Sequence, residues 1–194
     1  MDIFAYMSKL AAECEDENVV ALDWWNGCRS CLMDGELSGL MTGMTLQTTP
    51  AEIYRALLES LAFGMRRILD SYRDAGFDIR LLCACGGISL KNPFFMQMLS
   101  DVTRTRIRCS KPAPAPAIGA CMLAAVAVGE YASIHDAMTH MNCLAEAVYQ
   151  PDEAAASVYD KLYAEYLQLH DYFGLENNVM KRLRALSRAV KEDA

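Results

Sequence analysis

The 194-residue sequence has no run of about eighteen consecutive apolar residues, the length that a helix needs to cross a membrane. Its amino terminus also lacks the basic stretch, apolar core and cleavage site of a secretion signal. These absences argue against a membrane-embedded or secreted protein. They predict a cytoplasmic location and no membrane partner.

Basic residues are scarce relative to acidic ones, so the formal net charge is −7. Proteins that grip the phosphate backbone of nucleic acid usually carry a basic patch. The charge therefore argues against a nucleic-acid partner. The one basic cluster, over residues 181–191, falls on a predicted helix, where a solvated face or a cationic helix end explains it.

Apolar residues make up 53% of the sequence, which is ample for a packed core. The eight cysteines lie mostly within apolar patterns, and a chain of this size without a secretion signal needs no disulfide staples. We therefore predict buried free thiols. Cys28 and Cys31 have the spacing of half a zinc knuckle, but no second pair follows at a suitable distance, so we predict no metal site.

The first half of the chain carries local signals for helices and short strands. Asp2 is an acceptable N-cap for an amphipathic helix that ends near Glu15. Short strand regions follow over 19–22 and 38–44. Thr49-Pro50, followed by an early acid, then marks the start of a long helix that Gly76 ends.

Strands and helices alternate with short connections from Gly76 onward, which is typical of a parallel α/β sheet. Beyond Gly129 the pattern predicts helices only. The expected elements are a strand over 79–85, a helix over 93–103, a strand over 106–110, a small-residue helix over 118–128 suited to packing against a sheet, and helices over 133–141, 152–173 and 177–190.

The stretch from Leu81 to Pro93 is the centre of this pattern, because an apolar strand there breaks at Gly86 and Gly87 before a new helix begins. Glycine lacks a Cβ, so such a pair allows positive φ or the close approach of a flat ligand. Asn92 before a proline is also a good N-cap. On this local pattern alone, capping is favoured over ligand binding by roughly two to one.

Four stretches together resemble the C-terminal domain of the FGGY family of carbohydrate kinases. Residues Gly39 to Glu59 are similar to the second signature of the family, the turn from Cys85 to Asn92 to its adenosine motif, and Pro116 to Ala120 to its Ala-Leu-Gly-Ala helix start. Residues 21–30 look most like the ribulokinase branch. The resemblance runs from about Asp2 to Glu130.

The resemblance implies an α/β, ribonuclease-H-like (actin-like ATPase) fold with a mixed sheet flanked by helices. This domain would occupy residues 1–130, and a helical extension over 131–194 would pack on it. It implies the nucleotide-binding domain of an ATP-dependent sugar kinase, with ATP, ADP and a pentulose as partners and Mg²⁺ as cofactor. Within the ribulokinase branch the sugar is L-ribulose and the product L-ribulose 5-phosphate, in arabinose catabolism.

The resemblance also implies which residues bind the nucleotide. Gly86 and Gly87 would let adenosine approach the backbone, Ser89 and Lys91 would lie on the rim, and the Asn92 amide would hydrogen-bond the purine. This reverses the preference for capping, although one side chain could serve both roles. The catalytic base would lie upstream of Met1, so no catalytic residue is assigned and the chain alone is expected to be inactive.

Other residues and other functions stay open at this point. Asp23, Asn26 and Arg29 could face the sugar or its phosphate, but tryptophans such as their neighbours Trp24 and Trp25 more often serve a core or an interface. The alternatives are a xylulokinase or another sugar kinase of the family, or a non-catalytic domain that associates through its former cleft face, for instance as a homodimer.

Overall fold

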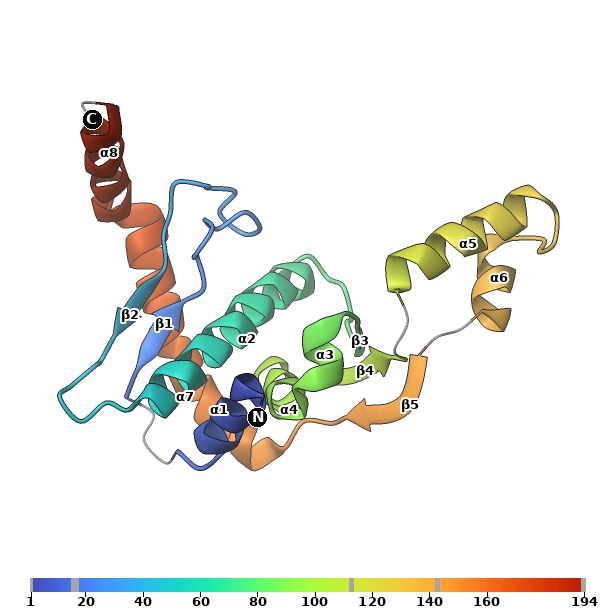
Figure 1. Ribbon diagram of the computed structural model, residues 1–194, viewed down its shortest axis with the longest axis horizontal. Coiled ribbons are helices and arrows are strands. Elements are labelled where there is room, and N and C mark those ends of the chain that lie inside the picture. Colours follow the sequence, from blue (N-terminus) through green and yellow to red (C-terminus); the bar gives the residue numbers. More distant parts are fainter. Residues whose placement is uncertain (1, 15–17, 112–113, 142–143, 193–194) are drawn as a thin grey trace.

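The computed structural model describes residues 2–14, 18–111, 114–141 and 144–192, and Figure 1 shows how the elements are arranged. In chain order they are α1 (Ile3–Ala12), β1 (Val20–Leu22), β2 (Leu40–Thr42), α2 (Pro50–Asp74), β3 (Leu81–Ala84), α3 (Gly87–Lys91), α4 (Pro93–Thr103), β4 (Arg106–Ser110), α5 (Ala115–Ala127), α6 (Ile134–His140), β5 (Leu144–Tyr149), α7 (Glu153–Asp171), the π-helical turn η1 (Tyr172–Glu176) and α8 (Val179–Glu192). None of the described helices is long and apolar enough to cross a membrane.

The strands form two small sheets. β1 and β2 pair antiparallel, whereas β3 pairs parallel with β4, and β5 adds to the other edge of β4 in the antiparallel sense. The parallel pair confirms the alternation predicted after Gly76. The prediction of helices only beyond Gly129 is wrong, because β5 is a strand that forms by pairing with β4. Strand formation depends on such partners more than on local sequence.

Helix α2 begins as its sequence predicts. The Thr49 hydroxyl accepts a hydrogen bond from the Glu52 amide at 3.3 Å, and the Glu52 carboxylate accepts one from the Thr49 amide. This reciprocal capping box satisfies two amides that the helix itself leaves without partners. It fixes the amino-terminal end of the longest helix, which packs on α1, α4 and β1.

Helix α7 completes the core. Its tyrosines Tyr159, Tyr163 and Tyr166 surround Phe63 of α2, with ring centroids 5.5–6.4 Å apart. All four rings are buried. The chain after residue 130 therefore shares one hydrophobic core with the elements before it.

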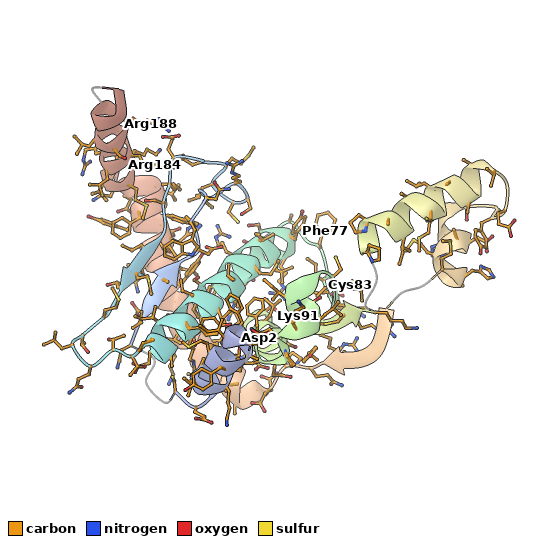
Figure 2. The ribbon with its side chains drawn as sticks, viewed as in Figure 1. Asp2, Phe77, Cys83, Lys91, Arg184 and Arg188 are labelled. Atoms are coloured by element: carbon orange, nitrogen blue, oxygen red, sulfur yellow. The ribbon has the colours of Figure 1, made fainter. Side chains whose placement is uncertain are left out.

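Helix α8 holds the loop between β1 and β2. Lys181 pairs with Asp34 at 2.6 Å and Arg188 with Glu36 at 2.9 Å, while Arg184 donates to the Gly35 carbonyl. The hydrogen bond from Lys181 holds the pKa of Asp34 below its usual value. Figure 2 shows Arg184 and Arg188 along α8. A solvated face or a cationic helix end therefore does not fully explain the basic cluster, because Lys181, Arg184 and Arg188 contact this loop.

Helix α5 does not pack against a sheet, so that prediction is wrong for this structure. None of its residues is buried, and it packs with α6, apart from the other elements (Figure 1). Pro114 precedes the helix in extended backbone. An uncharged, small-residue helix is suited to close packing, but its composition does not say which surface it meets.

The prediction of buried thiols holds for only some cysteines. Cys28 and Cys109 are buried, whereas Cys83, Cys85 and Cys121 are exposed. The three exposed thiols follow from the arrangement: two lie on or just after β3, and Cys121 lies on the uncovered α5. Cys143 lies outside the described residues.

Candidate functional site

The glycine turn after β3 has the backbone that its sequence predicts. Gly86 has φ +96°, a conformation that residues with a Cβ rarely adopt. Gly87 opens the short helix α3, which the sequence did not predict. The Ser89 hydroxyl donates to the Gly86 carbonyl at 2.9 Å and is buried. Ser89 therefore stabilises the turn. The prediction that it lies on the rim of the nucleotide site does not match this buried position.

Asn92 caps helix α4. Its Oδ1 accepts a hydrogen bond from the Phe95 amide at 3.0 Å, and Pro93 occupies the first turn of the helix. The capping interpretation is confirmed. The Nδ2 group has no hydrogen-bond partner within the part of the chain that the structure describes. Because the cap uses the oxygen alone, the amide nitrogen is left to donate to a ligand.

A pocket of about 450 Å³ lies beside this turn, between α1, α2 and α3. Gly87, Lys91 and Asn92 line it, whereas Gly86 and Ser89 are not among its lining residues. Figure 2 shows Lys91 and Asp2, two of the lining residues, close to one another at the ends of α3 and α1. The structure thus brings three of the five predicted nucleotide-binding residues to one pocket.

The opposite walls of this pocket were not predicted. Phe4 and Ala5 come from α1, Tyr54 and Leu58 from α2, and Ile88 from α3. Phe4 and Ile88 are more than half exposed although both are apolar. The signal in the sequence that could have indicated this wall is the apolar start of α1, which the structure leaves exposed.

The composition of the pocket determines which ligands suit it. Apolar and aromatic side chains form most of the lining, and Lys91 and the Asn92 amide supply donors at one side. Its volume falls within the usual range of about 300–1,000 Å³ for small-molecule sites. A flat heteroaromatic ring with hydrogen-bond acceptors on its edge matches these walls, and a cation at the rim suits an anionic substituent.

No metal site was found among the described residues, where no group of three or more histidine, cysteine or acidic side chains could hold an ion. The pocket itself contributes one carboxylate, Asp2, and that group already caps α1 by accepting from the Phe4 amide at 3.0 Å. The residues present therefore do not form a magnesium site of their own, because Mg²⁺ requires several oxygen ligands in octahedral geometry.

The loop after β1 lies away from this pocket. Trp24 is buried in the core and Trp25 is exposed. Asp23 accepts a hydrogen bond from the Tyr166 hydroxyl at 3.0 Å, and burial raises the pKa of its carboxyl above the usual value. Arg29 donates to the Asn26 carbonyl. Asp23, Trp24 and Arg29 line a different cavity, so the structure does not bring them to the glycine turn.

Comparison with known proteins gives a consistent result. The model of the FGGY family of carbohydrate kinases, C-terminal domain, matches residues 3–128. A ribulokinase of Bacillus licheniformis is 45% identical over 192 residues, which cover 96% of this chain and 35% of that protein. The chain therefore spans about a third of the length of the curated relatives it matches.

Solved structures of sugar kinases are also similar to this chain. A xylulose kinase from Rhodospirillum rubrum superposes with a TM-score of 0.71 at 28% identity, over 86% of this chain and 33% of that one. A glycerol kinase of Plasmodium falciparum, solved with ADP, gives a TM-score of 0.70 at 26% identity, over 87% of this chain and 34% of that one.

Proposed function

The chain belongs to the FGGY family of carbohydrate kinases, as the C-terminal domain, and we propose that it forms the adenosine-binding part of an ATP-dependent sugar kinase. One observation carries the proposal. The pocket beside the glycine turn combines apolar walls, a free amide and a cation at the residues that the family resemblance assigns to the nucleotide.

In this proposal the adenine ring enters between Ile88, Phe4 and Tyr54. The Asn92 Nδ2 donates to an acceptor nitrogen of the purine, while Oδ1 continues to cap α4. The positive φ of Gly86 turns the chain so that Gly87 presents backbone, without a side chain, to the ligand. Lys91 supports the negative charge of the phosphates from the rim.

Phosphoryl transfer depends on positioning and charge stabilisation around an in-line displacement more than on covalent chemistry from the protein. The described residues supply a cradle for the nucleoside. We assign them no catalytic base, and Mg²⁺ would be held by the ATP phosphates together with ligands from the sugar-binding domain that family members also have. The 194-residue chain by itself should therefore show no turnover.

We propose L-ribulose as the sugar and L-ribulose 5-phosphate as the product. The support is the 45% identity to proteins named ribulokinase, against 28% to the xylulose kinase structure. The test joins the chain in turn to the N-terminal domain of the Bacillus licheniformis ribulokinase and to that of the Rhodospirillum rubrum xylulose kinase, and it compares the ATP-dependent turnover of L-ribulose by the first hybrid with that of D-xylulose by the second. Higher turnover by the xylulose kinase hybrid would select the alternative, and turnover by the chain alone would contradict the proposed division of roles.

The nucleotide site is tested by separating the two roles of Asn92. Asn92→Ser and Asn92→Asp both keep a good N-cap acceptor but remove the amide donor. We expect thermal stability to stay close to that of the parent, while affinity for adenosine falls about five- to tenfold, the cost of one hydrogen bond. Adenosine is the probe because it carries no phosphate. Unchanged affinity in both variants would remove Asn92 from the site.

The exposure of α5 favours a second function, a non-catalytic domain that associates with copies of itself. None of the residues of α5 is buried, and Leu123 is 63% exposed. Apolar surface of this kind is commonly covered by association. Size-exclusion mass and an adenosine titration separate the two functions, because an interaction domain should form a homodimer and ignore adenosine.

Two features stay predictions in this proposal. The domain boundary near residue 130 matches the end of the family model at residue 128, although α7 shares the core of the first part. We also keep the prediction of a cytoplasmic location, because a sugar kinase that uses ATP is expected to act there.

A further inference from the structure

A second, smaller cavity of about 50 Å³ lies between the 23–31 loop, the middle of α2 and the end of α7. On α2 it is lined by Gly64 and Arg67, whereas the adenosine pocket reaches Leu58. Arg67 lies nine positions after Leu58, which places the two about 14 Å apart along the helix. The second cavity is therefore a separate site, and its role does not depend on the proposed kinase function.

One of the residues that line the cavity, His170, has a buried nitrogen without a hydrogen-bond partner among the described residues. His170 is 1% exposed, and its Nε2 has no hydrogen-bond partner among the described residues. Its Nδ1 lies 2.9 Å from the Asp171 carboxylate, so Nδ1–H donates there and Nε2 is left as the acceptor of the ring. A buried acceptor left unpaired is costly, which indicates that something donates to it.

A second acceptor, the carboxylate of Asp23, lines the same cavity. The Tyr166 hydroxyl satisfies Oδ1 at 3.0 Å. Oδ2 lies against Gly64, where an added Cβ would come within 2.3 Å of it. The glycine is therefore required for the carboxylate to lie this close to α2.

Two arginines line the same cavity. Arg29 uses its Nε for the Asn26 carbonyl at 3.3 Å, and Arg67 uses one Nη for the Ser71 hydroxyl at 3.3 Å. Neither guanidinium has a carboxylate partner within the described ranges. Each guanidinium has five N–H donors, so donors remain for an anion.

We propose that this cavity binds inorganic phosphate. The monoanion H2PO4− carries two P–OH groups, which donate to the acceptors of Asp23 and His170, while its other two oxygens accept from Arg29 and Arg67. The volume suits a small tetrahedral ion, because a single water needs about 10–15 Å³ on this scale. The protein carries a net charge of −7, so saturable binding of an anion requires a specific site of this kind.

The acceptors of Asp23 and His170 make the site selective. Sulfate has nearly the size and shape of phosphate but carries no proton at neutral pH, so it could donate to neither acceptor, and its two negative charges would face Asp23. A phosphate monoester loses its P–OH above its second pKa of about 6, so it should also bind poorly at neutral pH. Inorganic phosphate is present in part as H2PO4− under the same conditions, so it has a P–OH group for each acceptor and a lower charge than sulfate.

The test is calorimetric titration of the 194-residue chain at neutral pH and constant ionic strength, with inorganic phosphate, sulfate and glycerol 3-phosphate as separate probes. We expect phosphate to bind with one-to-one stoichiometry and at least about tenfold more tightly than either other anion. Equal binding of sulfate, tighter binding of the ester, or no saturable heat up to about 10 mM phosphate would overturn the proposal.

Variants test the geometry. Arg67→Gln should weaken phosphate binding about five- to tenfold, the cost of a charge-assisted hydrogen bond, whereas Arg182→Gln, at an exposed position outside the cavity, should leave it unchanged. Asp23→Asn replaces the carboxylate by a neutral amide and should bring sulfate affinity close to that for phosphate. Equal losses in Arg67→Gln and Arg182→Gln would show non-specific charge attraction and overturn the site, as would an unchanged preference for phosphate in folded Asp23→Asn.

Discussion

Removing the hydroxyl of Tyr166 tests how the buried carboxylate of Asp23 is stabilised. Tyr166 is 1% exposed, and its hydroxyl donates to Asp23 at 3.0 Å. Tyr166→Phe keeps the ring that packs on Phe63 and Tyr163 but leaves one carboxylate oxygen without its donor. A hydrogen bond to a charged group contributes about 1.5–3 kcal/mol. For a domain of this size the loss corresponds to a fall in Tm of about 3–12 °C.

The loss should depend on pH. Burial raises the pKa of Asp23 above its usual 3.8, and the Tyr166 hydrogen bond opposes this rise. The raised pKa means that the contribution of Asp23 to stability is fully present below pH 3.8 and is lost as pH rises through the folded-state pKa. Tyr166→Phe raises that pKa further, so its deficit should be largest at neutral pH and should shrink toward acid.

The assay is urea unfolding of the parent and the variant across this pH range, with Tyr163→Phe as the matched control on the same helix. The Tyr163 hydroxyl donates to Asp70 at 2.8 Å, but Asp70 is also paired with Arg73 and is partly exposed. Removal of the Tyr163 hydroxyl should therefore lower the free energy of unfolding by no more than about 1 kcal/mol. A Tyr166→Phe deficit that is no larger than the control, or that does not vary with pH, would refute the reasoning.

Three further predictions concern stability. Thr49→Ala removes half of the capping box and should cost about 0.5–2 kcal/mol in urea unfolding; no loss would show that α2 does not need its cap. Gly64→Ala places a Cβ within 2.3 Å of the Asp23 carboxylate and should lower the free energy of unfolding by at least about 2 kcal/mol. Gly119→Ala, where the added Cβ meets nothing within 4 Å, should raise it by about 0.5–1 kcal/mol. Equal effects of the two substitutions would contradict the packing of Asp23 on Gly64. Asp34→Asn removes a carboxylate whose pKa is lowered by Lys181, so the stabilising effect of that carboxylate exists above the usual pKa of 3.8 and disappears as pH falls through the folded-state pKa. Amide hydrogen exchange in α8 should therefore be faster in the variant at neutral pH but not in acid. An equal change at both pH values would contradict the pairing of Asp34 with Lys181.

Local signals in the sequence predicted several elements to the residue. The Thr49 cap and the proline after it mark the start of α2, and the bounds of α4 (Pro93–Thr103) and β4 (Arg106–Ser110) are those expected. Each signal depends on neighbours within a few residues. Caps, prolines at the first helical turn and short β-branched or apolar runs act over that range.

Features that depend on distant partners were not predicted. The strand β5 forms by pairing with β4, more than thirty residues earlier in the chain. Helix α5 has the composition of a packed helix, yet the structure leaves it uncovered. Composition shows that a segment can be buried, but the surface that would cover it is determined by the rest of the fold.

The candidate site divides in the same way. Gly86 and the Asn92 cap follow from residue types whose backbone preferences are local, and both are confirmed as backbone features. The wall formed by Phe4 and Tyr54 was missed because it requires α1 and α2 to lie beside a turn more than thirty residues further along the chain. Contacts across such distances leave no periodic trace in one sequence.

Filling the pocket between α1, α2 and α3 tests whether this pocket receives adenosine. Ala5 and Ala12 are both exposed on α1, but only Ala5 lines the pocket. We predict that Ala5→Trp weakens adenosine binding at least about tenfold in a calorimetric titration, because the indole occupies the space of the base, and that Ala12→Trp binds like the parent. Parent-like binding by Ala5→Trp, or no saturable adenosine binding by the parent chain, would contradict the account.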